Sequence, residues 1–158
     1  MADFMKPEQR SQAMSKVRGK ETLLERKFRS LLHRKGFRFR KNVNELPGRP
    51  DVVLPKYRAV IFVHGCFWHQ HPGCNKNTIP DTRSDFWREK LQANRERDAR
   101  AIEELSEMNW RVAVVWECEL TKKVIDRTLK SMEDWILSGK LWEDAGASKS
   151  FPELWRKL

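Results

Sequence analysis

The sequence predicts a single α/β domain with a mixed central sheet and helices on both of its faces. Two segments, residues 59–63 and 112–116, are apolar at every position, which is typical of strands buried on both faces of a sheet. The long segment 85–108 between them has helical spacing of its apolar residues. A strand, a helix and a second strand form a crossover unit, so we expect the two strands to be parallel and adjacent or nearly so.

Two more helices and a short strand complete the predicted fold. One helix should begin near Thr22 and end at Gly36. A turn at residues 46–50 leads into a short apolar strand, residues 51–54, and an amphipathic helix is expected at residues 124–137. The residues expected to share the apolar face of the first helix are Leu23, Leu24, Phe28, Leu31 and Leu32.

The composition favours a nucleic-acid partner. The 158 residues include 32 Lys and Arg and 22 Asp and Glu, a formal net charge of +10. Basic side chains that neutralise phosphates release counterions, so this charge favours a polyanion. Because we find no apolar run of transmembrane length and no signal segment, we expect a soluble, intracellular protein without a membrane partner. Residues 1–20 should be either a disordered end or an arm that contacts DNA, and residues 139–158 a C-terminal tail.

The three cysteines indicate a metal site, since an odd number argues against a disulfide framework. Cys66 and Cys74 lie in a loop that follows the first parallel strand, and Cys118 follows the second. Parallel strands end at the same edge of a sheet, so three thiolates and one imidazole can converge on a closed, tetrahedral Cys3His zinc site. Either His69 or His71 could supply the imidazole. The alternative is that these thiols bind no metal.

Polar residues at neighbouring strand ends form a candidate catalytic site. Asp51 opens the short strand, where a carboxylate can hold a divalent cation, although a turn aspartate is the simpler explanation. His64 follows the central strand, and it or His69 could transfer a proton at neutral pH. Glu25 fits a capping box with Thr22, which explains this glutamate without any catalytic role.

The predicted long helix carries a polar interruption. Asn94 and Asp98 lie on its otherwise apolar stripe. A buried carboxylate without a partner is costly. We therefore expect Asp98 to pair with a histidine of the loop between the first parallel strand and this helix, here called the crossover loop, and to fix the tautomer and direction of that histidine. The alternative is a pair between Asn94 and Asp98 within the helix, with Arg95 or Arg97 nearby.

These motifs together resemble the very-short-patch-repair (Vsr) mismatch endonucleases. The resemblance covers roughly residues 9 to 137 and includes similarity at residues 14–25 and 110–112. It includes residues 60–69, VIFVHGCFWH, and is highly specific in the block 62–69, FVHGCFWH. The other motifs that carry it are LPGRPD at residues 46–51, Asn94-x-x-Arg97-Asp98 and VWEC at residues 115–118. The resemblance implies a fold related to type II restriction endonucleases and nicking of one strand of duplex DNA beside the thymine of a T:G mismatch.

The same resemblance implies roles for the candidate catalytic residues. Asp51 would bind magnesium, and His69 and His64 would handle proton transfer and the charged phosphate. Glu25 would join them through water or metal, and Asp98 would orient His69. The zinc ligands that the resemblance implies are Cys66, His71, Cys74 and Cys118.

The resemblance also implies that Phe67, Trp68 and Trp87 form an aromatic wedge that enters the base stack near the mismatch. Inserting rings costs unstacking energy, and this cost is lowest at a mismatched step. The alternative for Phe67 and Trp68 is packing in the core. One departure from restriction-type nucleases is that residues 62–64, FVH, lack the acid-x-Lys motif. The metal would therefore rest on Asp51, a backbone carbonyl and DNA phosphates.

We therefore predict a magnesium-dependent mismatch endonuclease of very short patch repair that also contains structural zinc. It should act as a monomer on the bacterial nucleoid in the cytoplasm, with downstream repair proteins as further candidate partners. Two alternatives are kept. One is a restriction-like endonuclease that cuts paired DNA, and the other is a zinc-containing DNA-binding module without catalytic activity.

Overall fold

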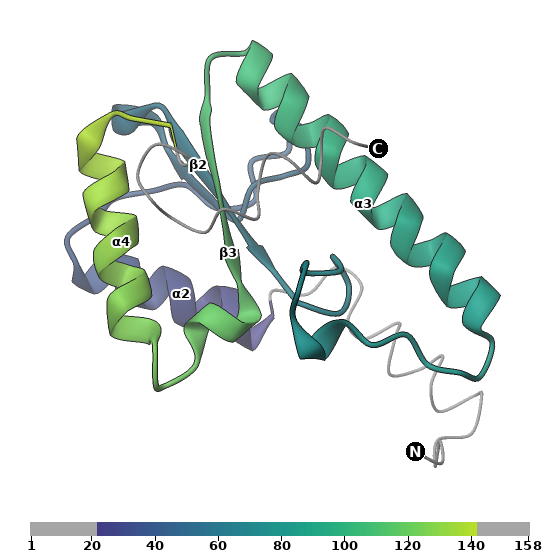
Figure 1. Cartoon of the computed structure of the whole chain (residues 1–158). Coiled ribbons are helices and arrows are strands. Elements are labelled where there is room, and N and C mark those ends of the chain that lie inside the picture. The colour runs from purple at the N-terminus through teal and green to yellow at the C-terminus, as the bar shows by residue number, and fades with distance from the viewer. Residues whose placement is uncertain (1–21, 142–158) are drawn as a thin grey trace.

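A three-stranded mixed sheet forms the centre of the protein in the computed structural model, which describes residues 22–141 (Figure 1). The strand order is β1-β2-β3. Strand β1 (Val52–Leu54) pairs antiparallel with β2 (Ala59–His64), which pairs in parallel with β3 (Arg111–Trp116). The predicted mixed sheet and the parallel pair of apolar strands are confirmed. The predicted arm, residues 1–20, and residues 142–158 of the predicted tail lie outside the described residues.

Helices cover both faces of this sheet, as predicted. Helices α2 (Leu23–Arg34) and α4 (Ile125–Ser138) lie on one face, and α3 (Ser84–Glu107) lies on the other (Figure 1). Helix α3 is the crossover between β2 and β3. None of the helices in this part of the chain combines the length and the apolar character needed to cross a bilayer.

Alternation along the strands divides the buried side chains into two clusters. On β2, Ile61 and Val63 belong to the cluster under α2 and α4, while Val60 and Phe62 belong to the cluster under α3. Every residue of β2 is buried, which agrees with a central strand covered on both faces. The helical side chains that complete the first cluster include Phe28, Leu32, Leu129, Met132, Trp135 and Ile136.

The prediction for the apolar face of the first helix is wrong at Leu23, which is 81% exposed. Phe28 and Leu32 are fully buried, and Leu24 and Leu31 pack against the same cluster. An α-helix turns about 100° per residue, so Leu23 lies on roughly the opposite side from Leu32. Leu23 therefore faces away from the sheet.

Candidate active site and metal centre

A cleft of about 610 Å³ brings the predicted catalytic side chains together. It lies beside the ends of the strands, with α3 forming one wall. Three basic residues, Arg49, Lys90 and Arg97, also line the cleft and give it charge that suits phosphates. The sequence interpretation did not assign a site role to any of these three. The predicted catalytic residues that line the cleft are Glu25, Asp51, His64, His69 and Asp98.

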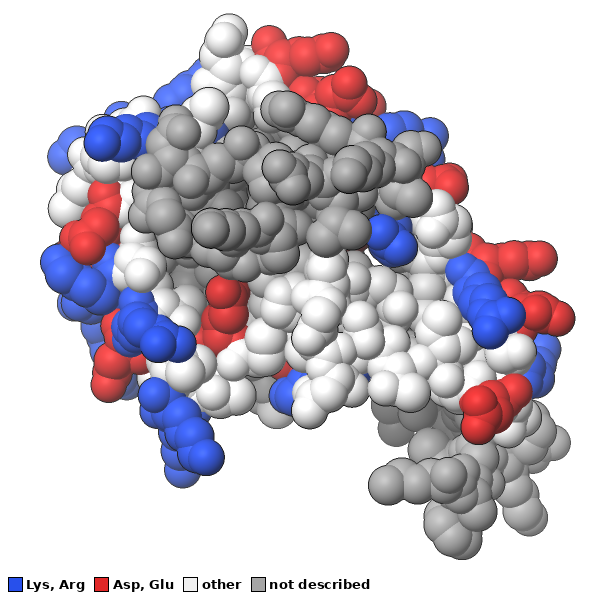
Figure 2. Space-filling view, in the orientation of Figure 1, with Lys and Arg blue, Asp and Glu red and all other residues white. Residues whose placement is uncertain are grey.

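The face shown in Figure 2 differs from the cleft in how its charged side chains are distributed. The middle of that face carries few charged side chains where it is formed by described residues, and basic side chains lie toward its edges. The described part of that face therefore offers no continuous basic surface for a polyanion. The basic residues of the cleft are better placed for this purpose, since they surround the candidate catalytic groups.

Asp51 stands immediately before β1, and its side chain, which is 14% exposed, lines the cleft. The backbone N–H of Val63 donates a hydrogen bond of 2.6 Å to Asp51 Oδ2, so a neighbouring strand holds this side chain. Burial, with a smaller contribution from the nearby Glu25 carboxylate, raises the pKa of Asp51 to about 7, despite this bond and the nearby charges of Arg29 and His69. A bound cation would stabilise the ionised form of a carboxylate that burial disfavours, and oxygen donors are those that Mg²⁺ prefers. Asp51 and Glu25 therefore fit a magnesium site.

Glu25 forms the predicted capping box and also lines the cleft. Its backbone N–H donates to Thr22 Oγ1 at 3.2 Å, and Thr22 N–H donates to Glu25 Oε2 at 3.3 Å, which completes a capping box. The same carboxylate lines the cleft with Asp51. The cap therefore fixes this side chain at the start of α2 and leaves it facing the site.

The structure places Asp98 of α3 beside His69 of the crossover loop. Asp98 Oδ2 lies 2.5 Å from His69 Nδ1. With its Nδ1–H directed at this carboxylate, His69 has Nε2 left to accept a proton. The alternative pair within the helix is not formed, because Asn94 donates from Nδ2 to Trp68 O at 3.1 Å and accepts a hydrogen bond from Arg97.

His64 is packed against His69 in a parallel stack. The two ring centroids are 3.8 Å apart and their planes differ by 5°. His64 is 4% exposed, and its burial, together with the charge on His69, lowers the pKa of His64 well below the usual value. His64 is therefore neutral at pH 7.

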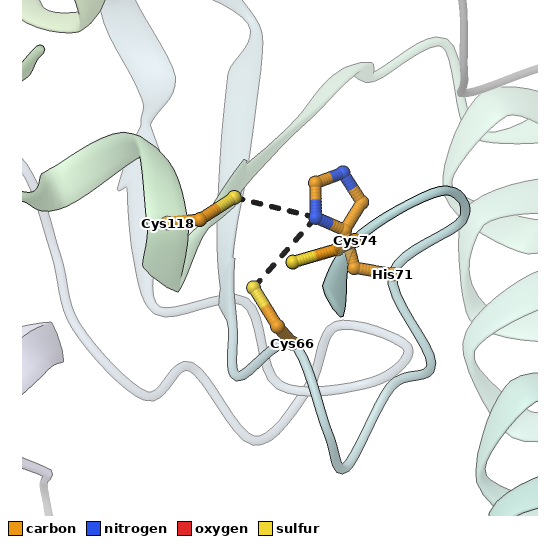
Figure 3. A group of neighbouring side chains, drawn as sticks. All are labelled: Cys66, His71, Cys74 and Cys118. Atoms are coloured by element: carbon orange, nitrogen blue, oxygen red, sulfur yellow. Dashed lines mark hydrogen bonds between the residues drawn. The ribbon is translucent and has the colours of Figure 1, made fainter. Parts of the chain in front are cut away.

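Three cysteines and one histidine form a second cluster beside the crossover loop (Figure 3). The ligand atoms of Cys66, His71, Cys74 and Cys118 all lie within 4.8 Å of one another. His71 Nδ1 is 3.6 Å from Cys66 Sγ and 3.3 Å from Cys118 Sγ. Of the two candidate histidines, His71 therefore joins the thiols, while His69 pairs with Asp98.

The chemistry of this cluster suits zinc. Burial raises the pKa of the Cys66 thiol to about 12 and also raises the pKa of Cys118, so these groups stay protonated unless a cation stabilises their thiolates. Three thiolates and one imidazole would supply all four ligands of a closed zinc site, which has no open position for water. Such a site is structural.

A column of rings connects the metal cluster to the candidate catalytic histidines. His71 stacks on Trp116 with centroids 4.2 Å apart, and the Trp116 ring meets His64 edge to face at 5.3 Å. His64 in turn stacks on His69. The sequence interpretation did not assign a role to Trp116, which is 3% exposed at the end of β3.

The three rings of the predicted wedge are in mutual contact. The Phe67 centroid lies 5.2 Å from that of Trp68 and 5.5 Å from that of Trp87. Trp87 is only 6% exposed, so it supports the other two rings from beneath. Phe86, which the sequence interpretation did not single out, is 43% exposed and packs on Trp87 at 5.5 Å. Lys90 Nζ lies within 6 Å of the Trp68, Trp87 and Phe86 rings.

Comparison with known proteins gives one consistent result. A family model described as DNA mismatch endonuclease Vsr matches residues 2–76. The chain is 45% identical over 139 residues to the DNA mismatch endonuclease Vsr of Escherichia coli (strain K12), covering 86% of this chain and 88% of that protein. It is 51% identical over 121 residues to the type II nicking enzyme V.XorIIP of Xanthomonas oryzae pv. oryzae, covering 77% of this chain and 88% of that enzyme. It is 47% identical over 127 residues to the type II nicking enzyme V.NmeAIP of Neisseria meningitidis, covering 80% of this chain and 90% of that enzyme.

Proposed function

Because this chain belongs to the family of the Vsr DNA mismatch endonucleases, we propose that it nicks one strand of duplex DNA beside the thymine of a T:G mismatch in a magnesium-dependent reaction. The observation that supports this best is the cleft in which Asp51 and the His69–Asp98 pair face the same space. A DNA-binding module without catalytic activity would not need this pair. We further propose a fold related to type II restriction endonucleases and a monomeric enzyme on the bacterial nucleoid, with repair proteins acting after it.

Two metals are part of this proposal. Asp51 and Glu25 would hold Mg²⁺, which when bound stabilises the charge on the attacking and leaving oxygens of a phosphodiester. Zn²⁺ would be held by the Cys3His cluster and would connect the loop that carries His69 to the turn that follows β3. Arg49, Lys90 and Arg97 would bind the DNA phosphates that enter the cleft.

His69 would transfer the proton in the hydrolytic step. Its Nε2 can take a proton from the attacking water, and the Asp98 carboxylate stabilises the imidazolium that results. The neutral His64 ring limits the rotation of His69 by stacking on it. The Phe67 and Trp68 rings would enter the base stack, with Trp87 as their support, and the low unstacking cost at a mismatch would favour cleavage there.

We expect the variant Asp98→Asn to cleave a T:G duplex about 10²–10⁴-fold more slowly, because the amide no longer stabilises a protonated His69. The dissociation constant for the same duplex should change little, since Asp98 is not a phosphate-binding cation. Single-turnover cleavage and a DNA-binding titration measure the two effects. The matched control is Asp134→Asn, which alters an exposed aspartate of α4. Unchanged cleavage by Asp98→Asn would contradict the assignment.

The proposed function itself is tested with end-labelled duplexes that differ only by T:G, T:A or C:G at one position. Each duplex is incubated with the protein in Mg²⁺ and in EDTA. Nicking that requires Mg²⁺ and occurs only in the thymine strand of T:G supports the proposal. Equal cutting of the paired duplexes would instead support a restriction-like endonuclease. Tight binding with no cutting would support a DNA-binding module.

A further inference from the structure

A buried arginine lies behind the acidic part of the cleft. Arg29 of α2 is 5% exposed, and Arg29 and His64 are the buried polar or charged residues of the described segment. Its Nε donates to the backbone oxygen of Asp51 at 2.8 Å, and its Nη2 donates to Asn42 Oδ1 at 3.2 Å. Arg29 does not line the cleft. Any influence of Arg29 on the reaction must therefore pass through its neighbours.

The guanidinium of Arg29 lies close to both carboxylates that would hold the divalent cation. Its Nη2 is 3.8 Å from Asp51 Oδ1 and 3.9 Å from Glu25 Oε2. An arginine does not lose its proton in a protein, so this positive charge is permanent. In this largely water-excluded position it offsets one of the two negative charges, and it repels a dication that approaches them.

We infer that Arg29 is a positioning residue that weakens the binding of a divalent cation to the free enzyme and thereby makes metal binding depend on DNA. This inference rests on the proposed function, in which Asp51 and Glu25 hold Mg²⁺. With Arg29 present, the two carboxylates and the guanidinium carry one net negative charge. A DNA phosphate in the cleft supplies the second negative charge. Metal and DNA then increase each other's affinity, because such coupling is reciprocal.

The test measures Mn²⁺ binding to the full-length, DNA-free protein by electron paramagnetic resonance. Arg29→Gln removes the charge but keeps hydrogen-bond donors for Asp51 O and Asn42 Oδ1, whereas Arg29→Lys keeps the charge. Arg34→Gln, an exposed position on the same helix, is the matched control. The measurements are made at about pH 8, so that protons compete less with Mn²⁺ for the carboxylates. Thermal unfolding shows whether each variant is folded.

We expect Arg29→Gln to bind Mn²⁺ about tenfold more tightly than the wild type, with Arg29→Lys and Arg34→Gln within about twofold of it. The Mg²⁺ concentration for half-maximal cleavage of a T:G duplex should fall in Arg29→Gln. Equal Mn²⁺ affinity in folded Arg29→Gln would overturn the inference and leave Arg29 with a structural role only. Weaker affinity in both Gln and Lys variants would also overturn it, because placement of Asp51 would then matter more than charge.

A further variant separates this inference from the proposed function. Introducing Asp51→Asn into either the wild type or Arg29→Gln should abolish the binding of Mn²⁺ to the cleft. If Mn²⁺ binds equally well with and without the Asp51 carboxylate, the metal is elsewhere and the metal assignment of the proposed function fails. If Asp51 is required but Arg29→Gln has no effect, only the inference about Arg29 fails. If Arg29→Gln does not fold, Arg29→Met is measured in its place and should bind Mn²⁺ more tightly than the wild type. Equal or weaker binding by Arg29→Met would overturn the inference.

Discussion

Asp51→Asn is expected to abolish cleavage and, at the same time, to stabilise the folded protein at pH 8. The loss of cleavage follows because an amide cannot replace the carboxylate that would hold Mg²⁺. The gain in stability follows because burial disfavours the ionised carboxylate in the folded state. The neutral amide can still accept the hydrogen bond from the Val63 N–H. A residue that we propose the reaction requires would thus be one whose ionised form lowers the stability of the fold.

The direction of the Asp51 pKa shift determines how the stability difference between the wild type and Asp51→Asn changes with pH. The pKa of Asp51 rises from 3.8 to about 7 on folding, so its folded state binds a proton more tightly than its unfolded state. The favourable contribution of the protonated carboxyl is fully present below pH 3.8 and is lost as the pH rises through about 7. Each pKa unit corresponds to about 1.4 kcal/mol, so ionised Asp51 should lower the free energy of unfolding by about 2–4 kcal/mol at pH 8.

Urea unfolding of the wild type and Asp51→Asn in Mg²⁺-free buffer measures this difference. The advantage of the variant should shrink from about 2–4 kcal/mol at pH 8 to below about 1 kcal/mol near pH 4, where both folded forms are neutral at this position. Asp134→Asn, which alters an exposed carboxylate, should show no such trend. A variant that still nicks DNA, or one that is less stable than the wild type at pH 8, would contradict the account of Asp51.

The sheet and its covering helices could be predicted because hydrophobic periodicity reports burial directly. Residues 59–63 and 112–116 are apolar on both faces, and their parallel pairing follows from the helix between them. The Asp98–His69 contact could be anticipated for a related reason, since a carboxylate on an apolar stripe needs a partner. These features depend on residue type and spacing alone.

Other features depend on local backbone geometry or on tertiary packing. Spacing could not decide between His69 and His71, because both lie in one short loop. Gln70 between them has a φ of +50°, and this left-handed residue helps to send the two imidazoles to different partners. Arg29 is one basic residue among 32 in the sequence, and only its i, i+4 spacing from Glu25 hinted at the pair. The role of Trp116 appears only when the two sites are seen side by side.

The second large effect is expected from Cys118→Ser, which removes the proposed metal ligand in the short turn after β3, Glu117–Leu120. The other three ligands, Cys66, His71 and Cys74, lie in the crossover loop, so Cys118 is the residue through which a metal would hold that loop against the sheet. A structural zinc site contributes directly to the free energy of folding. We therefore expect the variant to lose stoichiometric zinc and to become less stable.

Cleavage should fall at least about 10³-fold in Cys118→Ser, because small displacements of catalytic groups have large effects on rate. The loop carries His69 and the rings of Phe67 and Trp68. We expect the His71–Trp116–His64 column to pass a displacement of the cluster on to the His69 stack.

Elemental analysis of the purified proteins and single-turnover cleavage of a T:G duplex measure these two effects. Lys122→Ser, an exposed substitution shortly after Cys118, is the matched control and should keep both zinc and activity. Cys118→His supplies a nitrogen ligand in place of the sulfur ligand. It should therefore retain part of the bound zinc and part of the cleavage rate that Cys118→Ser loses. If the Ser variant lacks zinc but cleaves at the wild-type rate, the metal does not position His69, and the ring column has no functional role.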